Sequence, residues 1–321
     1  MTGDVDVLIV GAGPCGLYAA YYAGFRGLSV AMVDSLAMPG GQVTAMYPEK
    51  LIYDIAGFPA VRGRDLVDAL VEQASQFQPT YLLGRQACDL VDHDRGFEVR
   101  LGDGSAVRAG AVLITAGLGG FTPRPLPAGE GWVGRGVVFF VVKPDAHADQ
   151  DVIIVGGGDS AFDWALALQP VARSVTLVHR RTTFRAHAGT VAKVRDLGAQ
   201  IITGAQVTEL RGDHHVSECE ILTDAGDRCV QPAQAVVAAL GFLADLGPIQ
   251  SWGLQTRSRN ILVDSRMRTS RERVYAAGDV ADYPGKVKLI ATGFGEAATA
   301  INNIAVELDP SAHLFPGHSS N

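Results

Sequence analysis

Two stretches of the chain share one order of apolar runs, glycines and polar positions. Residues 5–10 form an apolar run that predicts a buried strand, residues 14–26 predict a helix, and residues 28–34 predict a second strand. The same order returns near the middle of the chain, as the strand "DVIIV" at 151–155, a helix from about residue 159 and the strand "SVTLVHR". Each stretch is typical of a βαβ unit that binds a nucleotide. We therefore expect two nucleotide-binding units in one chain.

The segments after each βαβ unit predict where the chain passes from one domain to the other. Alternating apolar residues over 80–115, with the turn "GDG", predict a small antiparallel insertion before the strand "AVLITAG", and "AVVAALGF" at 235–242 is a matching strand. Stretches rich in Gly and Pro follow at 119–129 and 241–248. These boundaries predict a domain of residues 118–243 inserted into a discontinuous domain of residues 1–117 and 244–321.

Composition and charge exclude several classes of protein. The chain has 321 residues, of which 47% are hydrophobic and 38 are Gly, as in a well-buried globular protein whose loops approach a ligand closely. A net charge of -7 and a pI near 5.6 argue against a nucleic-acid binder. Asp4 and Asp6 stand where a signal peptide would be basic, and glycines interrupt the first apolar run before it could span a membrane. We expect a soluble cytoplasmic protein.

The cysteines give no sign of thiol or metal chemistry. Cys15, Cys88, Cys219 and Cys229 form no C-x-x-C pair and have no metal-ligand spacing with the eight histidines. We therefore predict no metal site and no redox-active disulfide. Cys15 would lie at a helix N-terminus, which favours a thiolate, but a small residue that fills a tight turn is the preferred interpretation.

The glycine cluster after the first strand has the spacing of a dinucleotide-binding loop. Gly11, Gly13 and Gly16 form G-x-G-x-x-G between a strand and a helix, where they allow a tight turn and the close approach of a pyrophosphate to backbone N–H groups. Asp34 ends the next strand, 23 residues after Gly11, and is placed to accept hydrogen bonds from an adenosine ribose. This site is expected to hold an adenosine with a free 2'-hydroxyl.

The second glycine cluster leads to basic residues instead of a carboxylate. Gly156, Gly158 and Ala161 form the variant G-x-G-x-x-A, and the same offset of 23 residues from Gly156 leads to His179. The basic residues that follow are Arg180, Arg181 and Arg185. Guanidinium groups make charge-assisted bonds to a 2'-phosphate, which a carboxylate would repel. A solvated basic loop is the alternative, but its position at the end of the second strand favours an NADP-type cofactor.

A late strand, loop and helix suggest a contact with a flavin. Residues 274–285 read "VYAAGDVADYPG", and the helix "KLIATGFGEAATAINNIAVEL" follows. Asp279 could simply cap a turn. After two dinucleotide-binding loops we expect it instead to reach the ribityl or pyrophosphate part of a flavin, with the start of the helix facing the ring.

Motifs along nearly the whole chain carry a resemblance to one family. They are "VGAGPCGL", "GGQVTAMYPEKLIYDIAGFP", "VGGGDSAFDWAL", "HRRTTFRAH", "AAGDV", "IATGFGEAATAINN" and the C-terminal "HLFPGHSSN". Together they resemble the two-dinucleotide-binding flavoprotein reductases, and most closely the ferredoxin-NADP reductases of the thioredoxin-reductase-like type. The resemblance implies an α/β fold of two Rossmann-like dinucleotide-binding domains with three-layer ββα architecture. FAD would lie in the discontinuous domain and NADP(H) in the inserted one.

The resemblance also implies which residues line the two sites. Tyr47 matches an aromatic residue that stacks on one face of the isoalloxazine, and His318 matches a residue that covers the other face from the partner subunit of a homodimer. A core aromatic and a frayed terminus are the alternatives. Further residues expected at FAD are Pro14, Cys15, Gly41, Gln42, Phe121 and Thr292. Further residues expected at NADPH are Asp159 and Ser160.

The stretch before the second glycine cluster bears on the electron acceptor. A thioredoxin reductase would carry a C-x-x-C pair there, but this chain reads "FFVVKPDAHADQD". The resemblance therefore implies a ferredoxin-NADP reductase, in which hydride passes from NADPH to FAD and single electrons leave for ferredoxin or flavodoxin. The alternatives are a reductase of a quinone, oxygen or a separate disulfide protein, and a flavin redox sensor without turnover. Arg62 and Arg64 would form a basic patch for an acidic ferredoxin, or are solvated residues at a helix start.

Overall fold

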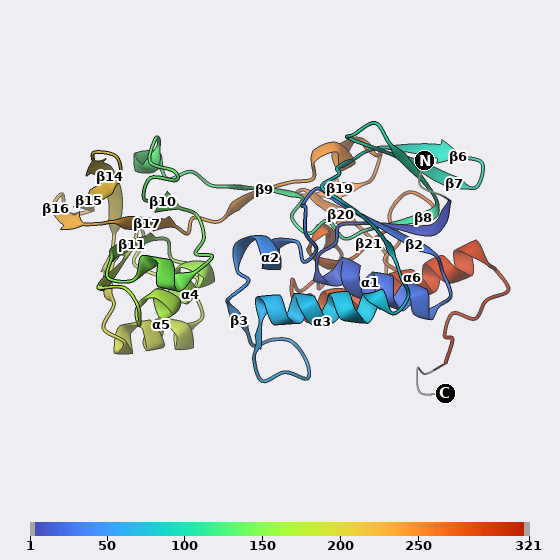
Figure 1. Ribbon diagram of the computed structural model, residues 1–321, viewed down its shortest axis with the longest axis horizontal. Helices are drawn as coiled ribbons and strands as arrows, with labels where there is room; N and C mark the ends of the chain where they lie inside the picture. The colour runs from blue at the N-terminus through green and yellow to red at the C-terminus, as the bar shows by residue number, and fades with distance from the viewer. Residues whose placement is uncertain (1–3, 318–321) are drawn as a thin grey trace. The chain divides into compact units, whose positions relative to one another are not determined.

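The chain divides into two units, each built around parallel strands of its own sheet (Figure 1). The computed structural model describes residues 4–317, with backbone alone for Phe121 and Ala244. Unit 1 comprises Met1–Gly120 and Ala244–Asn321, and unit 2 comprises Phe121–Leu243. The two connecting segments pair with each other as strands β9 (Gly120–Pro123) and β18 (Phe242–Asp245). The α/β fold with two Rossmann-type sheets that was expected from the sequence is confirmed.

The sheet of unit 1 has a parallel centre that includes the first βαβ unit. One edge of strand β8 pairs with two strands. Its first half is antiparallel to β7, and its last residues are parallel to β21. Its other edge pairs with β1. The strands are β5 (Thr80–Leu83), β2 (Val30–Asp34), β1 (Val5–Val10), β8 (Ala106–Ile114), β7 (Gly96–Leu101), β6 (Ala87–His93) and β21 (Val274–Ala276).

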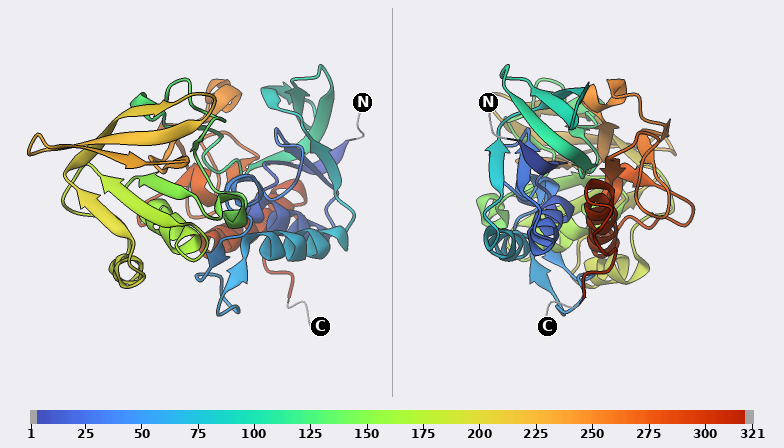
Figure 2. Two further views of the ribbon diagram at one scale, coloured as in Figure 1. Left: turned by 60° about the vertical axis from the view of Figure 1, so that its left-hand side comes forward. Right: turned by 90° about the vertical axis from the view of Figure 1, so that its right-hand side faces the viewer.

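The two faces of this sheet bury different layers. Val7 and Ile9 of β1 pack against the helical layer, whereas Leu8 and Val10 pack on the opposite face with residues of β6 and β7. This alternation follows from the period of two residues in a strand. The helical layer consists of α1 (Pro14–Phe25), α3 (Gly63–Ser75) and α6 (Ile290–Leu308). Figure 2 shows these helices along one side of the strands. The parallel strands of unit 1 therefore lie between a layer of helices and the antiparallel strands β6 and β7.

Unit 2 repeats this plan on a smaller scale. Its sheet is fully parallel in the order β10-β17-β11-β12-β13. Ile153 and Val155 of β11 pack on Val207 and Ile221 of an antiparallel β-meander. The parallel strands are β10 (Val137–Val138), β17 (Ala235–Ala238), β11 (Asp151–Val155), β12 (Ser174–His179) and β13 (Gln200–Thr203). The meander and helices are β14 (Ala205–Gly212), β15 (Val216–Thr223), β16 (Arg228–Pro232), α4 (Asp159–Leu168) and α5 (Ala188–Asp196).

Short elements connect these layers, and one predicted boundary moves. The expected strand from residue 28 begins at Val30, because Ser29 donates its backbone N–H and its hydroxyl to Asp6 Oδ2, at 2.7 and 2.6 Å. Within residues 4–317 no helix is both long and apolar enough to cross a membrane. The remaining elements in unit 1 are α2 (Gln42–Met46), β3 (Leu51–Ile52), β4 (Val61–Arg62), β19 (Thr256–Arg257), β20 (Asn260–Leu262), β22 (Ala281–Asp282) and the 3-10 turns η3 (Gly247–Ser251) and η4 (Gly278–Val280). Those in unit 2 are the 3-10 turns η1 (Pro127–Gly129) and η2 (Pro144–His147).

Candidate functional site

The first glycine loop joins β1 to α1 and admits no side chain at two of its positions. A Cβ atom at Gly11, whose φ is +113°, would lie 2.6 Å from the carbonyl oxygen of Thr115. A Cβ atom at Gly16 would lie 2.0 Å from the carbonyl oxygen of Gly11. Thr115 is buried and donates its hydroxyl to Gly11 O at 2.7 Å. No sequence motif points to Thr115, which follows β8 and holds this turn.

Gly40 and Gly41 meet this loop at the start of α1. Gly13 precedes Pro14, the first residue of the helix, and no side chain caps the helix N-terminus. A Cβ atom at Gly41, whose φ is +56°, would lie 3.0 Å from Gly13 Cα, and Gly40 donates its N–H to Ala12 O at 2.8 Å. The backbone of both loops is therefore bare beside a helix N-terminus without a side-chain cap. A pyrophosphate fits such a cradle, because uncapped N–H groups and the helix dipole both favour an anion.

Asp34 lies at the end of β2 and holds the first glycine loop. Its Oδ2 accepts the N–H of Ala12 at 2.7 Å, and its Oδ1 accepts the N–H of Leu36 at 2.8 Å. Burial raises the pKa of the Asp34 carboxyl, and these two N–H groups partly oppose that rise. Each carboxylate oxygen has a second lone pair, so Asp34 could still accept a ribose hydroxyl.

Cys15, on the first turn of α1, packs against two glycines from the far end of the chain. Cβ atoms built at Gly278 and Gly293 would lie 3.0 and 2.2 Å from its sulfur. Burial, followed by the carboxylates of Asp279 and Glu296, raises the pKa of the Cys15 thiol to about 12. Cys15 is therefore a neutral thiol that fills a tight turn, and a thiolate at this helix N-terminus is excluded near neutral pH.

Tyr47 and Asp279 belong to the same cluster of side chains. Tyr47 follows α2 and is half-buried. Burial raises the pKa of its hydroxyl to about 12, and the carboxylates of Asp279 and Asp54 add to the rise. The backbone carbonyl of Asp279 is held by the Asn260 side-chain amide at 2.6 Å. Tyr47 thus stays neutral beside a carboxylate across the physiological pH range.

The remaining residues expected at FAD lie around this cluster or outside the described side chains. Gln42 begins α2, and a Cβ atom at Gly117 would lie 3.1 Å from its amide nitrogen. Thr292, in the first turn of α6, is half-buried and precedes Gly293. The side chain of Phe121 and the whole of His318 lie outside the part of the chain that the structure describes.

In unit 2 the second glycine loop packs against His179. A Cβ atom at Gly156 would lie 2.4 Å from Ala239 O and 3.0 Å from Ala161 Cβ, and one at Gly157 would lie 2.3 Å from His179 Cε1. A Cβ atom at Gly158 would have no neighbour within 4 Å, and no side chain caps α4 there. Gly158 therefore presents bare backbone at the start of α4, where a pyrophosphate could bind.

The basic loop after β12 is fixed by its backbone and exposes its guanidinium groups. Arg185 donates its backbone N–H to Gly157 O at 2.8 Å, and His187 donates its backbone N–H to Asp159 Oδ1 at 2.9 Å. Arg180, Arg181 and Arg185 are exposed, and none forms an ion pair with another residue of the range 4–317. No carboxylate neutralises these three guanidinium groups, so they could bind a 2'-phosphate. Their fixed loop favours this interpretation over a freely solvated loop.

His179, Asp159 and Ser160 lie beside this basic loop. Burial lowers the pKa of His179, and the charges of Arg181, Arg180 and Arg185 lower it further, while a hydrogen bond to Thr183 O opposes them. His179 is therefore neutral at pH 7. Asp159 and Ser160 form the exposed first turn of α4, and the carboxylate of Asp159 is occupied with the basic loop.

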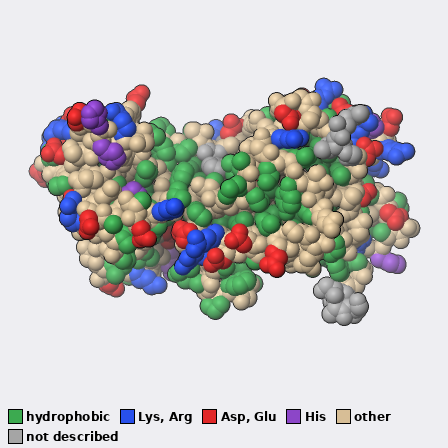
Figure 3. All heavy atoms as spheres, viewed as in Figure 1, with side chains coloured by type: hydrophobic (Ala, Val, Ile, Leu, Met, Phe, Trp, Pro, Cys, Tyr) green, Lys and Arg blue, Asp and Glu red, His purple; other side chains and the backbone are tan. Residues whose placement is uncertain are grey.

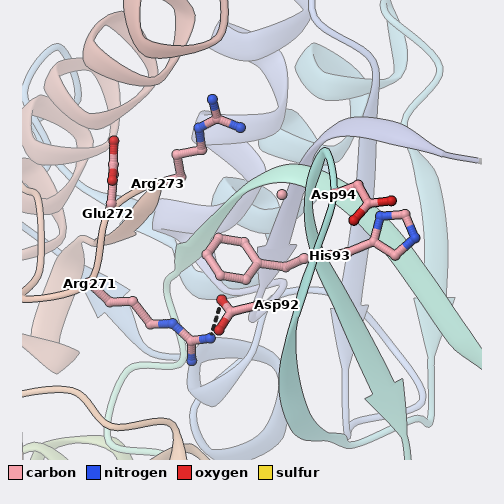
Figure 4. Close-up of a pocket in the computed structure, with 8 residues that line it drawn as sticks. Asp92, His93, Asp94, Arg271, Glu272 and Arg273 are labelled. Carbon is pink, nitrogen blue, oxygen red and sulfur yellow. Dashed lines mark hydrogen bonds and ion pairs between the residues drawn. The ribbon is translucent and has the colours of Figure 1, made fainter.

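A polar surface pocket in unit 1 lies apart from the predicted residues. It lies between the β6–β7 hairpin and residues 271–273, where Arg271 is paired with Asp92 at 2.6 Å (Figure 4). No residue expected at FAD lines it. Among residues 4–317, no group of three or more His, Cys, Asp or Glu side chains is arranged to hold a metal ion.

Comparisons with known proteins identify the family of this chain. The family model for pyridine nucleotide-disulphide oxidoreductases matches residues 5–302. A ferredoxin-NADP reductase of Saccharopolyspora erythraea is 72% identical over 320 residues, which cover 99% of this chain and 98% of that protein. One of Halalkalibacterium halodurans is 45% identical, with 98% and 97% covered. A T. acidophilum thioredoxin reductase structure superposes with a TM-score of 0.84 at 27% identity, over 94% of this chain and 98% of that one.

The family expected from the motifs is thereby confirmed, and the matched range includes both glycine loops and the start of α6. All four cysteines of the chain are free thiols in the structure, so the similarity to a thioredoxin reductase does not extend to a cysteine pair. The chain belongs to the pyridine nucleotide-disulphide oxidoreductase family and, within it, to the ferredoxin-NADP reductases.

Proposed function

We propose that this chain is an FAD-dependent ferredoxin-NADP reductase, which takes hydride from NADPH and delivers single electrons to ferredoxin or flavodoxin. The observation that carries the proposal is the contrast between the two glycine loops. The first is tied to the carboxylate of Asp34, whereas the second is tied to the loop of Arg180, Arg181 and Arg185. A carboxylate suits the ribose of FAD, and guanidinium groups suit the 2'-phosphate of NADPH. A relative with this name is 72% identical to this chain.

Unit 1 is the proposed FAD domain. The loops around Gly11, Gly13 and Gly41 would hold the pyrophosphate, and Asp34 would hold the adenosine ribose. Tyr47 would lie against one face of the isoalloxazine, with Asp279 on the ribityl side. Pro14, Cys15, Gly16, Gln42, Phe121 and Thr292 complete the proposed site. When bound, FAD accepts two electrons together and releases them singly.

Unit 2 is the proposed NADP(H) domain. Gly156 and Gly158 keep the start of α4 bare for the pyrophosphate, and Asp159 and Ser160 form its first turn. The backbone bond from Arg185 to Gly157 O places the basic loop beside this helix start. Burial and the charges of the neighbouring arginines lower the pKa of His179, which would adjoin the 2'-phosphate.

The chain's own residues orient the cofactors and do not need to donate or accept protons. The hydroxyl of Tyr47 and the thiol of Cys15 both have a pKa of about 12, so neither releases a proton near pH 7. Both groups therefore stay neutral near pH 7, and they would contribute to the shape of the flavin site. We further propose a cytoplasmic homodimer, in which His318 of each chain covers the flavin of the other.

An external electron carrier is the proposed acceptor because an internal disulfide has no support. Cys15 and Cys219 have thiol pKa values raised to about 12 by burial, which disfavours thiolates.

Arg62 and Arg64 are the residues expected in a basic docking surface for ferredoxin. Arg62 and Arg64 both pair with Glu49, at 3.6 and 2.8 Å, which favours the solvated alternative for these two residues. On the face drawn in Figure 3, basic and acidic side chains are interspersed.

Anaerobic reduction of the flavin by NADPH tests this proposal. The purified protein should carry a yellow flavin whose absorbance bleaches rapidly with NADPH and much more slowly with NADH. A flavin that NADPH does not reduce would indicate a sensor. Rapid bleaching followed by reoxidation with a quinone, oxygen or a disulfide protein, but not with ferredoxin or flavodoxin, would indicate a reductase with another acceptor.

A further inference from the structure

A buried ion pair lies directly behind the turn that carries Asp279. Lys286 precedes α6 and Glu296 lies on it, and their side chains are 5% and 4% exposed. Lys286 Nζ donates to both carboxylate oxygens of Glu296, at 2.6 Å from Oε2. Tyr283 donates its hydroxyl to Oε1 at 2.6 Å. Neither residue belongs to a dinucleotide-binding motif, and the proposed electron transfer does not use them.

The third partner of this carboxylate is the backbone of the turn itself. Gly278 donates its N–H to Glu296 Oε2 at 2.8 Å. Its φ of +79° requires glycine, and a Cβ atom there would lie 3.0 Å from Cys15 Sγ. Asp279 is the next residue, and its carboxylate raises the pKa values of Cys15 and Tyr47. The Gly278 N–H thus links Glu296 to the residue expected beside the flavin.

Stability alone does not account for this pair. Two charges in a protein interior lose their hydration, and well-packed apolar residues often give equal stability in the same place. What an apolar pair cannot supply is an acceptor for the buried N–H of Gly278. The hydrogen bond, rather than the charge, is therefore the local property that a polar residue at position 296 preserves.

We propose that Glu296 is a positioning residue, which holds the Gly278–Asp279 turn for FAD and is itself held by Lys286 and Tyr283. This inference rests on the proposed function, because it assigns the turn to the flavin site. Glu296 would not touch the reacting atoms. Loss of its hydrogen bond would free the turn and weaken FAD binding.

Two double variants separate the hydrogen bond from the charge. Lys286→Met with Glu296→Gln removes both charges but keeps an amide oxygen for the Gly278 N–H. Lys286→Met with Glu296→Leu removes the charges and the acceptor. Both should fold, because each replaces a buried ion pair with a neutral pair. Release of FAD from the holoprotein, followed by flavin fluorescence, should be about tenfold or more faster for the Leu variant, and within about threefold of wild type for the Gln variant.

Two single variants serve as matched controls. Tyr283→Phe removes one donor to Glu296 but leaves Lys286 to hold the carboxylate and Gly278 bonded to it, so FAD release should stay within about threefold of the wild-type rate. Glu307→Gln alters a second carboxylate of α6 that also accepts a tyrosine hydroxyl and a backbone N–H, from Tyr275 and Arg273. It lies 11 residues further along the helix, about 16 Å away, and should likewise leave FAD release unchanged.

Hydrogen exchange gives a readout that does not depend on the flavin. Mass spectrometry of the peptide containing Gly278 should show faster deuterium uptake in the Leu variant than in the Gln variant. Equal FAD release and equal uptake in the two double variants would overturn the inference. If the wild-type protein carried no flavin or resisted NADPH, the proposed function would fail, and the difference in uptake would still decide whether Glu296 holds the turn.

Discussion

The imidazole of His179 occupies the space that a side chain at position 157 would need. A Cβ atom at Gly157 would lie between 2.3 and 2.5 Å from three atoms of this ring. The ring also lies 5.6 Å from that of Phe184, and its Nε2 is 3.2 Å from Thr183 O. One aromatic side chain therefore joins the glycine loop of unit 2 to the basic loop that follows β12.

Gly157→Ala should destabilise unit 2 even without a ligand. The new methyl group must displace the His179 ring, and overpacking of this kind costs about 1–3 kcal/mol of unfolding free energy. Gly158→Ala is the matched control, because a Cβ atom there meets nothing within 4 Å and φ is -100°. Denaturant unfolding of the ligand-free proteins measures both. Equal stability of the two variants would contradict the packing described for Gly157.

Arg180→Ala combined with Arg185→Ala should weaken NADPH binding by about 100-fold, since each charge-assisted hydrogen bond contributes about 1.5–3 kcal/mol. NADH binding should change little, because NADH has no 2'-phosphate. Titration of the holoprotein with each nucleotide gives the two affinities. Arg195→Ala removes another exposed arginine of unit 2, in the last turn of α5, and should affect neither nucleotide. An equal loss for NADPH and NADH in the double variant would refute the assignment.

Alkylation should distinguish the cysteines by the pKa values of their thiols. Iodoacetamide reacts with thiolates, and the thiol pKa values of Cys15 and Cys219 are raised to about 12. At pH 8 the exposed Cys229 should be modified first, while Cys15 and Cys219 should react only after unfolding. Mass spectrometry of peptides from the native and the denatured protein provides the comparison. Early modification of Cys15 would show that a thiolate exists beside Asp279.

Arg26→Ala should loosen the segment that follows α6. The Arg26 guanidinium donates to His313 O at 2.8 Å, Leu314 O at 3.3 Å and Asn302 Oδ1 at 3.1 Å. Without the bonds to His313 O and Leu314 O, residues 310–317 are held less firmly, so proteases should cut there sooner. Arg26→Lys keeps the charge but cannot make all three bonds from one planar group, and should give an intermediate rate. Identical cleavage rates for wild type and Arg26→Ala would show that the segment is held in another way.

Local pattern was sufficient to predict the elements of each βαβ unit. The helices begin at Pro14 and Asp159 as expected, because each follows a strand and a glycine that ends it. The strand expected from residue 28 begins two residues later, since Ser29 bonds to the side chain of Asp6. Sequence spacing could not reveal such a contact between side chains far apart in the chain.

Two residues that support glycine turns from distant segments could not be found from sequence spacing. Thr115 supports Gly11 across 104 residues of sequence, and Glu296, which lies on α6, supports Gly278 across 18 residues. Neither has a fixed offset from a glycine motif. A partial signal existed for Glu296, because it is the sole charged residue in the apolar, small-residue run "IATGFGEAATAI". Asp34 and His179, to which the offset rule leads, both lie against their glycine loops, because in a βαβ unit the loop and the end of the next strand are adjacent.

We propose that electrons from NADPH leave this protein for a one-electron carrier. An anaerobic assay with NADPH and cytochrome c, run with and without added ferredoxin, tests it most directly. Cytochrome c reduction should rise with ferredoxin concentration and saturate, because ferredoxin would carry single electrons from the flavin to the cytochrome. A rate that is indifferent to ferredoxin, in a protein whose flavin NADPH still bleaches, would contradict the claim.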